Sequence, residues 1–297
     1  MKQRSAIKIV HDLWLLMKPE LTLLSVFTSV CSAYLAVKEN YYFDVAQYVS
    51  LAIGTLLVGG GAGALNQYAE REYDALMKRT EKRPVPEGRI LPNEALLWGI
   101  IISIAGIAVL TLALNILSGL LAALTLTTYL FFYTPLKRIT SVATIIGAVP
   151  GALPILIGWA AVRNEITIEA VSLFAILFYW QMPHFYSIAW LYRNDYARAK
   201  FQLLSVIDAT GKMLASRVNL NLFLLFLVST TPALLGFVSM QYLFGAIITS
   251  GLFLLYGMKF SRKVSLQDSS QVYASKLFFA SIAYLPIIFT LMIIYKK

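Results

Sequence analysis

Residues 61–89 read GAGALNQYAEREYDALMKRTEKRPVPEGR, and this stretch takes the chain from an apolar run into a dense group of charges. Asn66, Glu70 and Asp74 follow one another at intervals of four residues, which places them on one face of a helix. Basic residues come directly afterwards. Because carboxylates at the end of an apolar span are costly and usually functional, the stretch predicts a membrane helix that ends in a polar site.

The composition places the rest of the chain in a membrane as well. Of the 297 residues, 59% are hydrophobic and 13% are charged, and the mean hydropathy is +0.71. A soluble domain carries about 25% charged residues. The single cysteine, Cys31, lies inside an apolar run, so no disulfide framework is expected. Apolar runs with short connections fill the chain and predict a single domain over 1–297, although the length alone would favour two.

Apolar runs of about 17–25 residues are long enough to cross a bilayer as helices. The chain holds nine such runs, which predicts an all-α integral membrane protein with nine transmembrane helices. They cover about 21–38, 47–66, 95–114, 116–134, 142–162, 169–189, 218–238, 241–258 and 277–295. The break between the third and fourth runs, at Leu114–Leu117, depends only on Asn115 and Ser118–Gly119. If the two runs formed one span, every later span would cross the membrane in the opposite direction.

The distribution of Lys and Arg predicts the orientation. With the N-terminus in the cytoplasm, 21 of the 25 basic residues fall on the cytoplasmic side. This asymmetry follows the positive-inside rule and puts the C-terminus on the opposite side. It also explains the net charge of +10 without a nucleic-acid partner. The first cytoplasmic segment, 1–20, has no small-residue cleavage site and is expected to be retained. The others are 67–94, 135–141, 190–217 and 259–276.

The oxygen atoms of Asn66, Glu70 and Asp74 suit Mg²⁺, which is usually held by one or two carboxylates and by substrate phosphates. The helix rises about 12 Å from Asn66 to Asp74, at about 1.5 Å per residue. One ion cannot bridge that length, but a magnesium-bound diphosphate could if other helices contribute. The alternative is a solvated loop that merely obeys the positive-inside rule. The basic run beyond the acids supplies Lys78, Arg79 and Arg83 for the phosphate oxygens.

A second polar cluster, YTPLKR, covers residues 133–138 at the end of the fourth run. Lys137 and Arg138 could hold diphosphate oxygens beside Tyr133. Taken alone, the segment is better explained as an interfacial tyrosine followed by ordinary cytoplasmic cations.

The third cluster, WQMPHFYSIAWLYRNDYARAK, covers residues 180–200 and closes the sixth run. Asp195 is a candidate second magnesium carboxylate, with Arg193 and Arg198 as phosphate contacts. His184 and Tyr192 are candidates for an acceptor pocket, although a lone intramembrane histidine is often a packing residue. All three clusters fall on the same predicted membrane face, so one site could collect them.

These residues resemble the UbiA superfamily of intramembrane prenyltransferases. Its members carry an Asn-Asp-x-x-Asp-x-x-x-Asp motif after the second span and a second Asp-rich motif after the sixth. The residues NQYAEREYD, 66–74, stand in the first position, and the resemblance covers essentially the full length. The segments GAVPGALPILIGWAAV, from Gly147, and WQMPHF, from Trp180, are similar to the branch of the superfamily whose acceptor is heme.

The resemblance implies nine helices around a lipid-accessible cavity with a cytoplasmic-facing active site, in a bacterial plasma (inner) membrane. It implies transfer of the farnesyl group of farnesyl diphosphate to a vinyl group of heme b, with water addition, giving heme O and diphosphate. Mg²⁺ would be the cofactor, and heme b is a substrate. Heme A synthase or cytochrome oxidase assembly factors are the protein partners that this activity implies.

The resemblance also assigns roles by position. The expected catalytic and metal-binding residues are Asn66, Glu70, Asp74 and Asp195. The expected diphosphate-binding residues are Lys78, Arg79, Arg83, Tyr133, Lys137, Arg138, Arg193 and Arg198. The chain departs from the family pattern in four places. Gln67 and Glu70 replace Asp, Leu191 leaves Asp195 alone in the second motif, KFQL at 200–203 replaces Gly-Phe-Pro-Met, and Glu20 stands where Arg is frequent.

Other functions have distinct signatures. A related prenyltransferase could use a quinone-type aromatic acceptor, which the segments from Gly147 and Trp180 disfavour. A transporter or channel would place polar broken helices near the midplane in paired halves, whereas the charges here gather at one face. A non-catalytic assembly subunit would bind heme or proteins without consuming diphosphate.

Overall fold

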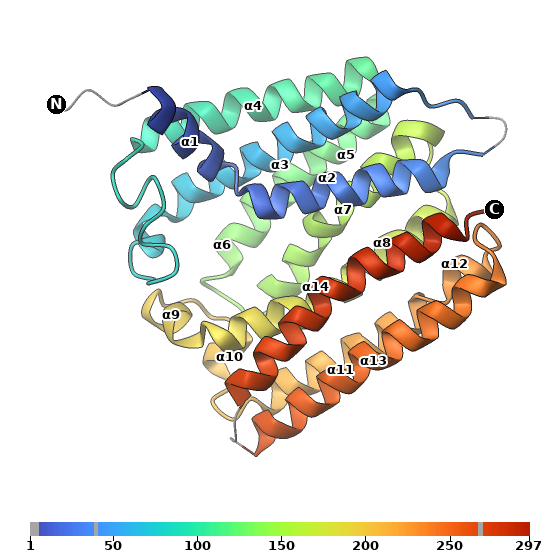
Figure 1. The fold of residues 1–297 in the computed structure, drawn as a ribbon. Coiled ribbons are helices and arrows are strands. Elements are labelled where there is room, and N and C mark those ends of the chain that lie inside the picture. The colour runs from blue at the N-terminus through green and yellow to red at the C-terminus, as the bar shows by residue number, and fades with distance from the viewer. Residues whose placement is uncertain (1–5, 39–40, 267–269) are drawn as a thin grey trace.

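The chain folds into a bundle of helices (Figure 1). The computed structural model describes residues 6–38, 41–266 and 270–297. The elements of the first part are α1 (Ala6–Leu16), α2 (Pro19–Ala36), α3 (Val45–Asp74), α4 (Pro92–Ala113), α5 (Ile116–Thr127), the π-helix η1 (Thr128–Tyr133), α6 (Thr134–Leu136) and α7 (Ala143–Arg163). The second part holds α8 (Ile168–Leu191), α9 (Arg193–Arg198), α10 (Leu204–Ile207), α11 (Lys212–Val228), α12 (Thr231–Leu234), α13 (Met240–Ser265) and α14 (Ser270–Ile294).

Eight helices in the described ranges are long and apolar enough to cross a bilayer, and each corresponds to a predicted run. The remaining run forms α8, a helix of 24 residues that packs against α7, α11 and α14. It is not among the eight, and its second half carries Trp180, Gln181 and His184. The all-α membrane fold is confirmed, and the count of nine spans stays a prediction.

The weakest predicted boundary, between the third and fourth runs, is confirmed. α4 ends at Ala113 and α5 begins at Ile116. Asn115 separates them as the N-cap of α5, because its side-chain oxygen accepts a hydrogen bond from the Ser118 amide at 2.9 Å. Its amide nitrogen also donates to the carbonyl oxygen of Ala160 at 2.7 Å, which ties the turn to α7. A side-chain oxygen that satisfies a free amide is the ordinary way to start a helix.

α1 and the C-terminal end of α14 lie at opposite ends of the bundle (Figure 1). The N-terminal end carries α1, the long connection between α3 and α4, and α9. Within the predicted cytoplasmic segment 1–20, residues 6–16 form α1, and residues 1–5 lie outside the described residues. Which end of the bundle faces the cytoplasm stays a prediction.

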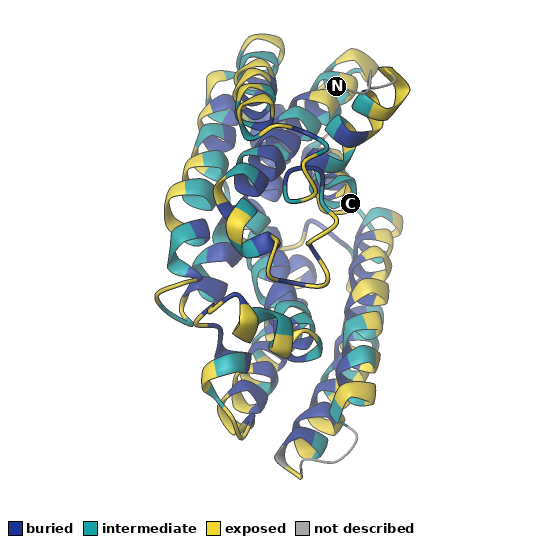
Figure 2. Cartoon of the chain, turned by 90° about the vertical axis from the view of Figure 1, so that its left-hand side faces the viewer, coloured by how far each residue is buried: buried dark blue, intermediate teal, exposed yellow. Residues whose placement is uncertain are grey.

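The packing divides the helices into two groups. α2 to α7 form the first group, and α8, α11, α13 and α14 form the second, joined through contacts of α7 with α8 and of α2 with α14. Large side chains such as Trp159, Tyr242 and Tyr284 fill the interior. Exposed residues line the outer faces of the helices (Figure 2), and these include Leu112, 85% exposed on α4. An apolar exterior of this extent fits lipid rather than water.

Helices α2 and α7 approach closely because α7 has a glycine at the contact. A Cβ atom placed on Gly158 would lie 1.9 Å from the backbone oxygen of Ser29 in α2. The backbone on both sides would have to move to admit one. Small residues at a contact let membrane helices approach this closely.

We therefore expect Gly158→Ala to lower the free energy of unfolding by about 1–3 kcal/mol, the range for overpacking a core. Gly251→Ala is the matched control, since no atom lies within 4 Å of a Cβ at that position in α13. Denaturant unfolding in one detergent would measure both variants. Equal stability of Gly158→Ala and Gly251→Ala would contradict the close contact.

Candidate functional site

The last turns of α3 carry a polar face into the protein interior. Asn66 is 0% exposed, Glu70 5% and Asp74 1%, although they lie where the helix leaves the bundle. A charge buried without a partner costs several kcal/mol. Both carboxylates must therefore be neutralised by other parts of the chain.

Each of the three side chains has a partner from a different segment. Lys18, just before α2, donates to the Asn66 side-chain oxygen at 2.5 Å. Lys137, just after α6, pairs with Glu70 at 2.5 Å. Arg83, in the connection after α3, pairs with Asp74 at 2.7 Å. The site thus joins the ends of α2, α3 and α6 through charged hydrogen bonds.

Thr134 and the π-helix complete the surroundings of Asn66. The amide nitrogen of Asn66 donates to the Thr134 hydroxyl at 3.0 Å, and that hydroxyl donates to the Tyr129 carbonyl at 2.9 Å. Short π-helical stretches occur often at functional sites. Here η1 turns Tyr129 and Tyr133 toward the cavity described below.

The two lysines experience opposite electrostatic effects. Burial lowers the pKa of Lys18 to about 7, and the nearby Arg83 charge acts in the same direction. Burial also disfavours the charged form of Lys137, but the adjacent Glu70 carboxylate outweighs it and raises the pKa of Lys137. Lys137 is therefore a permanent cation, whereas Lys18 changes its charge near neutral pH.

The connection between α3 and α4 folds back over the end of α3. The Thr80 hydroxyl donates to the Asp74 carbonyl at 2.8 Å, and this contact starts the turn that brings Arg83 to the Asp74 carboxylate. Arg89 pairs with Asp12 of α1 and donates to the Lys82 carbonyl at 2.8 Å. The basic run is thus ordered by its own hydrogen bonds and by α1.

The second predicted acidic position docks on this connection. Asp195 of α9 accepts a hydrogen bond from the Arg79 backbone amide at 3.1 Å and pairs with Arg198. Arg198 also donates to the Leu76 carbonyl at 3.3 Å. The structure therefore brings the second motif against the connection that follows the first one, but Asp195 makes no hydrogen bond or ion pair with the residues Glu70 and Asp74.

Aromatic rings hold several of the remaining predicted cations. The guanidinium of Arg79 lies 5.2 Å from the centre of the Tyr192 ring. Arg138 donates to the Tyr73 hydroxyl at 2.8 Å, and Arg193 lies 4.4 Å from the Trp190 ring. Lys78 is exposed. Tyr192 thus lies beside a basic residue and is not among the residues that line the cavity.

A cavity of about 190 Å³ extends from the polar site into the bundle. Lys18 lines one end, and residues of α2, α3, η1, α7 and α8 form the walls. Tyr133 packs over Gly147, where an added Cβ would lie 2.5 Å from the tyrosine ring. Lys137 lies 4.7 Å from the centre of the Tyr133 ring. An apolar chain with a charged head would fit this shape.

His184 lines the cavity together with Trp180 and Gln181. Its Nδ1 atom lies 2.8 Å from the Ser281 hydroxyl of α14, and its ring stacks between Trp180 and Phe278 at centroid distances of 5.2 and 5.1 Å. The ring is therefore held in one orientation. His184 thus lines a cavity, and its role in binding the acceptor stays a prediction.

Sequence reasoning missed Lys18 and Thr134 as members of the site. Lys18 precedes a proline at the start of a span, which reads as an ordinary interfacial cation. Its backbone has φ of 50°, in the left-handed region, and this turn lies between α1 and α2.

The donors present fit a magnesium-bound diphosphate better than a metal held by protein alone. Asn66, Glu70 and Asp74 are hard oxygen ligands, and each already contacts a cation. Among the described residues no three His, Cys, Asp or Glu side chains gather closely enough to hold a metal ion. Mg²⁺ commonly takes one or two carboxylates and completes its shell with phosphate oxygens and water.

Comparison with known proteins identifies the family of the chain. The sequence pattern of the UbiA prenyltransferase family matches residues 25–282, so the chain belongs to that family. The protoheme IX farnesyltransferase of Solibacter usitatus (strain Ellin6076) is 44% identical over 251 residues, which cover 84% of each chain. The protoheme IX farnesyltransferase of Opitutus terrae (strain DSM 11246 / JCM 15787 / PB90-1) is 39% identical over 94% of this chain and 92% of its own.

Solved structures share the fold. A digeranylgeranylglyceryl phosphate synthase superposes with a TM-score of 0.75 at 16% identity and covers 96% of this chain and 98% of its own. A UbiA homolog from Archaeoglobus fulgidus, solved bound to GPP and Mg²⁺, has a TM-score of 0.68 at 14% identity over 95% and 99% of the two chains. At this level of identity the likeness concerns the fold.

The ion pair between Lys137 and Glu70 makes a testable prediction. Lys137→Met should lower the free energy of unfolding by about 3–5 kcal/mol, because it leaves a buried carboxylate unpaired. The double variant Lys137→Met/Glu70→Gln should recover most of the loss. Denaturant unfolding in detergent without Mg²⁺ or substrates would measure both. Equal stability of the single and double variants would show that the pair is not coupled.

Proposed function

We propose that this chain transfers the farnesyl group of farnesyl diphosphate to a vinyl group of heme b, with addition of water, and releases heme O and diphosphate. The observation that carries the proposal is the meeting of buried acids and cations at the head of an apolar cavity. The names of the relatives, protoheme IX farnesyltransferases at 34–44% identity, support the acceptor. A quinone-type acceptor is not favoured.

Asn66, Glu70 and Asp74 would bind the Mg²⁺ that accompanies the diphosphate. Asp195 would bind a second Mg²⁺ or lie among the groups that surround the phosphates. The complex of the Archaeoglobus fulgidus homolog with GPP and Mg²⁺ supports a magnesium-bound prenyl diphosphate as the ligand. Bound Mg²⁺ would supply Lewis-acid neutralisation of the leaving diphosphate. Each of these acids is paired with a cation. When Mg²⁺ replaces the cations as the partner of the acids, the cations would contact the phosphate oxygens instead.

Lys18, Lys137 and Arg83 are the cations closest to the acidic face, and they would bind the departing diphosphate. Arg79 and Arg198, held by Asp195, would close the site from the side of α9. Fixed donors aimed at developing negative charge are the largest single contribution in many enzymes. The remaining predicted cations, Lys78, Arg138 and Arg193, would contribute to the surrounding field.

The carbon–oxygen bond at carbon 1 of the farnesyl group breaks, and its electron pair leaves with the diphosphate. The rings of Tyr129 and Tyr133 would stabilise the allylic cation through their π faces. The terminal vinyl carbon of heme b then bonds to carbon 1. Water adds to the cation that results and releases a proton, which gives the hydroxyethylfarnesyl side chain. The apolar walls would limit earlier capture by water.

We place this site at the cytoplasmic face of a bacterial plasma membrane, because the basic residues gather at that end of the predicted topology. Farnesyl diphosphate would enter from the aqueous side and heme b from the bilayer. Heme A synthase and cytochrome oxidase assembly factors are the expected neighbours of such an enzyme.

The activity can be tested with purified protein in lipid nanodiscs. With Mg²⁺, farnesyl diphosphate and heme b, the product read by mass spectrometry should be heme O. Asp74→Asn should lower turnover by about 10³-fold or more, because a buried ligand and the partner of Arg83 are both altered. Glu81→Gln is the matched control, since Glu81 is an exposed acid of the same connection.

Three results would contradict the proposal. Near-normal heme O formation by Asp74→Asn would remove the site assignment. Prenylation of an aromatic acid but not of heme b, under the same conditions, would favour the quinone-type alternative. Diphosphate release that does not depend on Mg²⁺ would contradict the assigned metal.

His184 gives a separate prediction about the acceptor. His184→Phe keeps a ring between Trp180 and Phe278 but removes both ring nitrogens. We expect the KM for heme b to rise about tenfold, the loss of one hydrogen bond or ligand contact, while the KM for farnesyl diphosphate stays constant. Ser281→Ala, which removes only the partner of Nδ1, is the control. Equal changes in both KM values would place His184 outside the acceptor pocket.

A further inference from the structure

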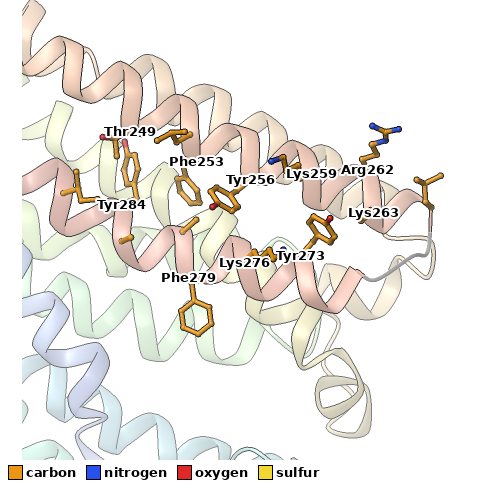
Figure 3. A pocket seen from close by; sticks show the side chains of 15 residues that line it. Thr249, Phe253, Tyr256, Lys259, Arg262, Lys263, Tyr273, Lys276, Phe279 and Tyr284 are labelled. Atoms are coloured by element: carbon orange, nitrogen blue, oxygen red, sulfur yellow. The ribbon is translucent and has the colours of Figure 1, made fainter.

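A second hollow lies between α13 and α14, apart from the cavity described above. Its volume is about 930 Å³, and the two sets of lining residues have no member in common. Figure 3 shows side chains of both helices along it. The Trp190 ring of α8 contacts Phe260 of α13 at 6.4 Å, so this end of α13 lies at the same end of the bundle as the polar site.

Cations from both helices gather at one end of the hollow. Lys259 and Arg262 come from α13, and Lys276 comes from α14. The ammonium of Lys276 lies 5.1 Å from the centre of the Tyr273 ring, and that of Lys263, on the opposite helix, lies 5.7 Å from it. Among the described residues, no carboxylate forms an ion pair with Lys259, Arg262 or Lys276. Lys259, Arg262 and Lys276 all line the hollow, so a bound anion there would meet three cations.

The other end of the hollow is apolar. Phe253, Ala283 and Ile287 line it, and Tyr256 lies between the apolar part and the cations (Figure 3). Its floor is fixed, because Tyr284 packs on Phe253 at 5.2 Å and its hydroxyl lies 3.1 Å from the Ser250 hydroxyl. The hollow thus has a charged end near the membrane surface and an apolar end that reaches toward the bilayer interior.

The length of the hollow matches one lipid leaflet. The lining residues on α13 run from Thr249 to Lys263, and fourteen residues of helix rise about 21 Å. Half of the hydrocarbon core is about 15 Å thick, so about 6 Å remain for a headgroup. A free phosphate would use only the charged end, and a lipid of this length would use both.

We propose that the groove between α13 and α14 binds one anionic phospholipid, with its phosphate on Lys259, Arg262 and Lys276 and an acyl chain along Phe253 and Ile287. Basic pockets between membrane helices suit anionic headgroups, and each nearby cation strengthens the interaction. The net positive charge distinguishes an anionic lipid from a zwitterionic one. This proposal is independent of the prenyltransferase activity.

Native mass spectrometry of the full-length protein, titrated with phosphatidylglycerol or phosphatidylcholine in detergent, tests the proposal. We expect one phosphatidylglycerol to bind the unaltered protein more tightly than phosphatidylcholine. Lys259→Ala/Lys276→Ala should weaken that binding about 30-fold, about fivefold for each cation removed. Lys8→Ala/Lys212→Ala removes the same net charge from exposed positions outside the groove and should change the affinity less than twofold.

Three outcomes would overturn the proposal. The two double variants could lose phosphatidylglycerol equally, which would indicate a diffuse effect of net charge. Phosphatidylcholine could bind the unaltered protein as tightly as phosphatidylglycerol. Inorganic phosphate or heme b could displace the lipid at equimolar concentration, which would assign the groove to a free anion or to the porphyrin. A folded double variant is verified by an unchanged unfolding midpoint in detergent without added lipid.

Discussion

The burial of two carboxylates at the end of a membrane helix is the constraint on which the polar end of this protein depends. Glu70 and Asp74 are almost fully inaccessible, and a buried charge without a partner is unstable by several kcal/mol. Lys137 and Arg83 meet that requirement. Lys137 lies far from Glu70 along the chain, just after α6, and Arg83 lies in the connection that folds back over the end of α3. The position of α6 and the path of the connection after α3 follow from these two pairs.

Stability alone does not explain such pairs, because apolar side chains of similar size often stabilise a protein as well as a buried ion pair does. The site holds five cations, Lys18, Arg79, Arg83, Lys137 and Arg198, and three carboxylates, Glu70, Asp74 and Asp195. This excess suits an anionic ligand that arrives with a metal. Because the pKa of Lys18 is about 7, its ammonium is only partly charged near neutral pH, and a bound anion would favour the charged form.

Much of the fold follows from local sequence. Runs of apolar residues predict the spans, and Asn115 predicts the break between α4 and α5 because its side chain can cap a helix. The spacing of Asn66, Glu70 and Asp74 predicts a shared helix face, since helix geometry is local. The hydropathy of α8 is a weaker guide, because the polar side chains that line the cavity reduce the apolar signal of the helix that carries them.

What the sequence could not predict depends on tertiary contacts. The π-helix from Thr128 to Tyr133 changes which backbone amides and carbonyls are hydrogen-bonded to each other. The spacing of the side chains along the sequence gives no sign of that change. The pairing of Asp195 with the Arg79 amide depends on how α9 packs against the connection after α3. Lys18 enters the site through a left-handed turn that neither charge nor hydropathy marks.

The two ends of the cavity have different chemistry, and this division bears on how the protein can select two substrates. Charged side chains surround one end, whereas at the other end Gln181 donates to the Ala148 carbonyl at 3.2 Å and His184 is bonded to Ser281. Polar groups that are hydrogen-bonded within the protein do not need water as a partner. An allylic cation formed at the charged end would therefore face aromatic rings and an acceptor before it meets solvent. The arrangement separates recognition of a diphosphate from recognition of an apolar acceptor, so that changes in α8 and α14 can alter the second without disturbing the first.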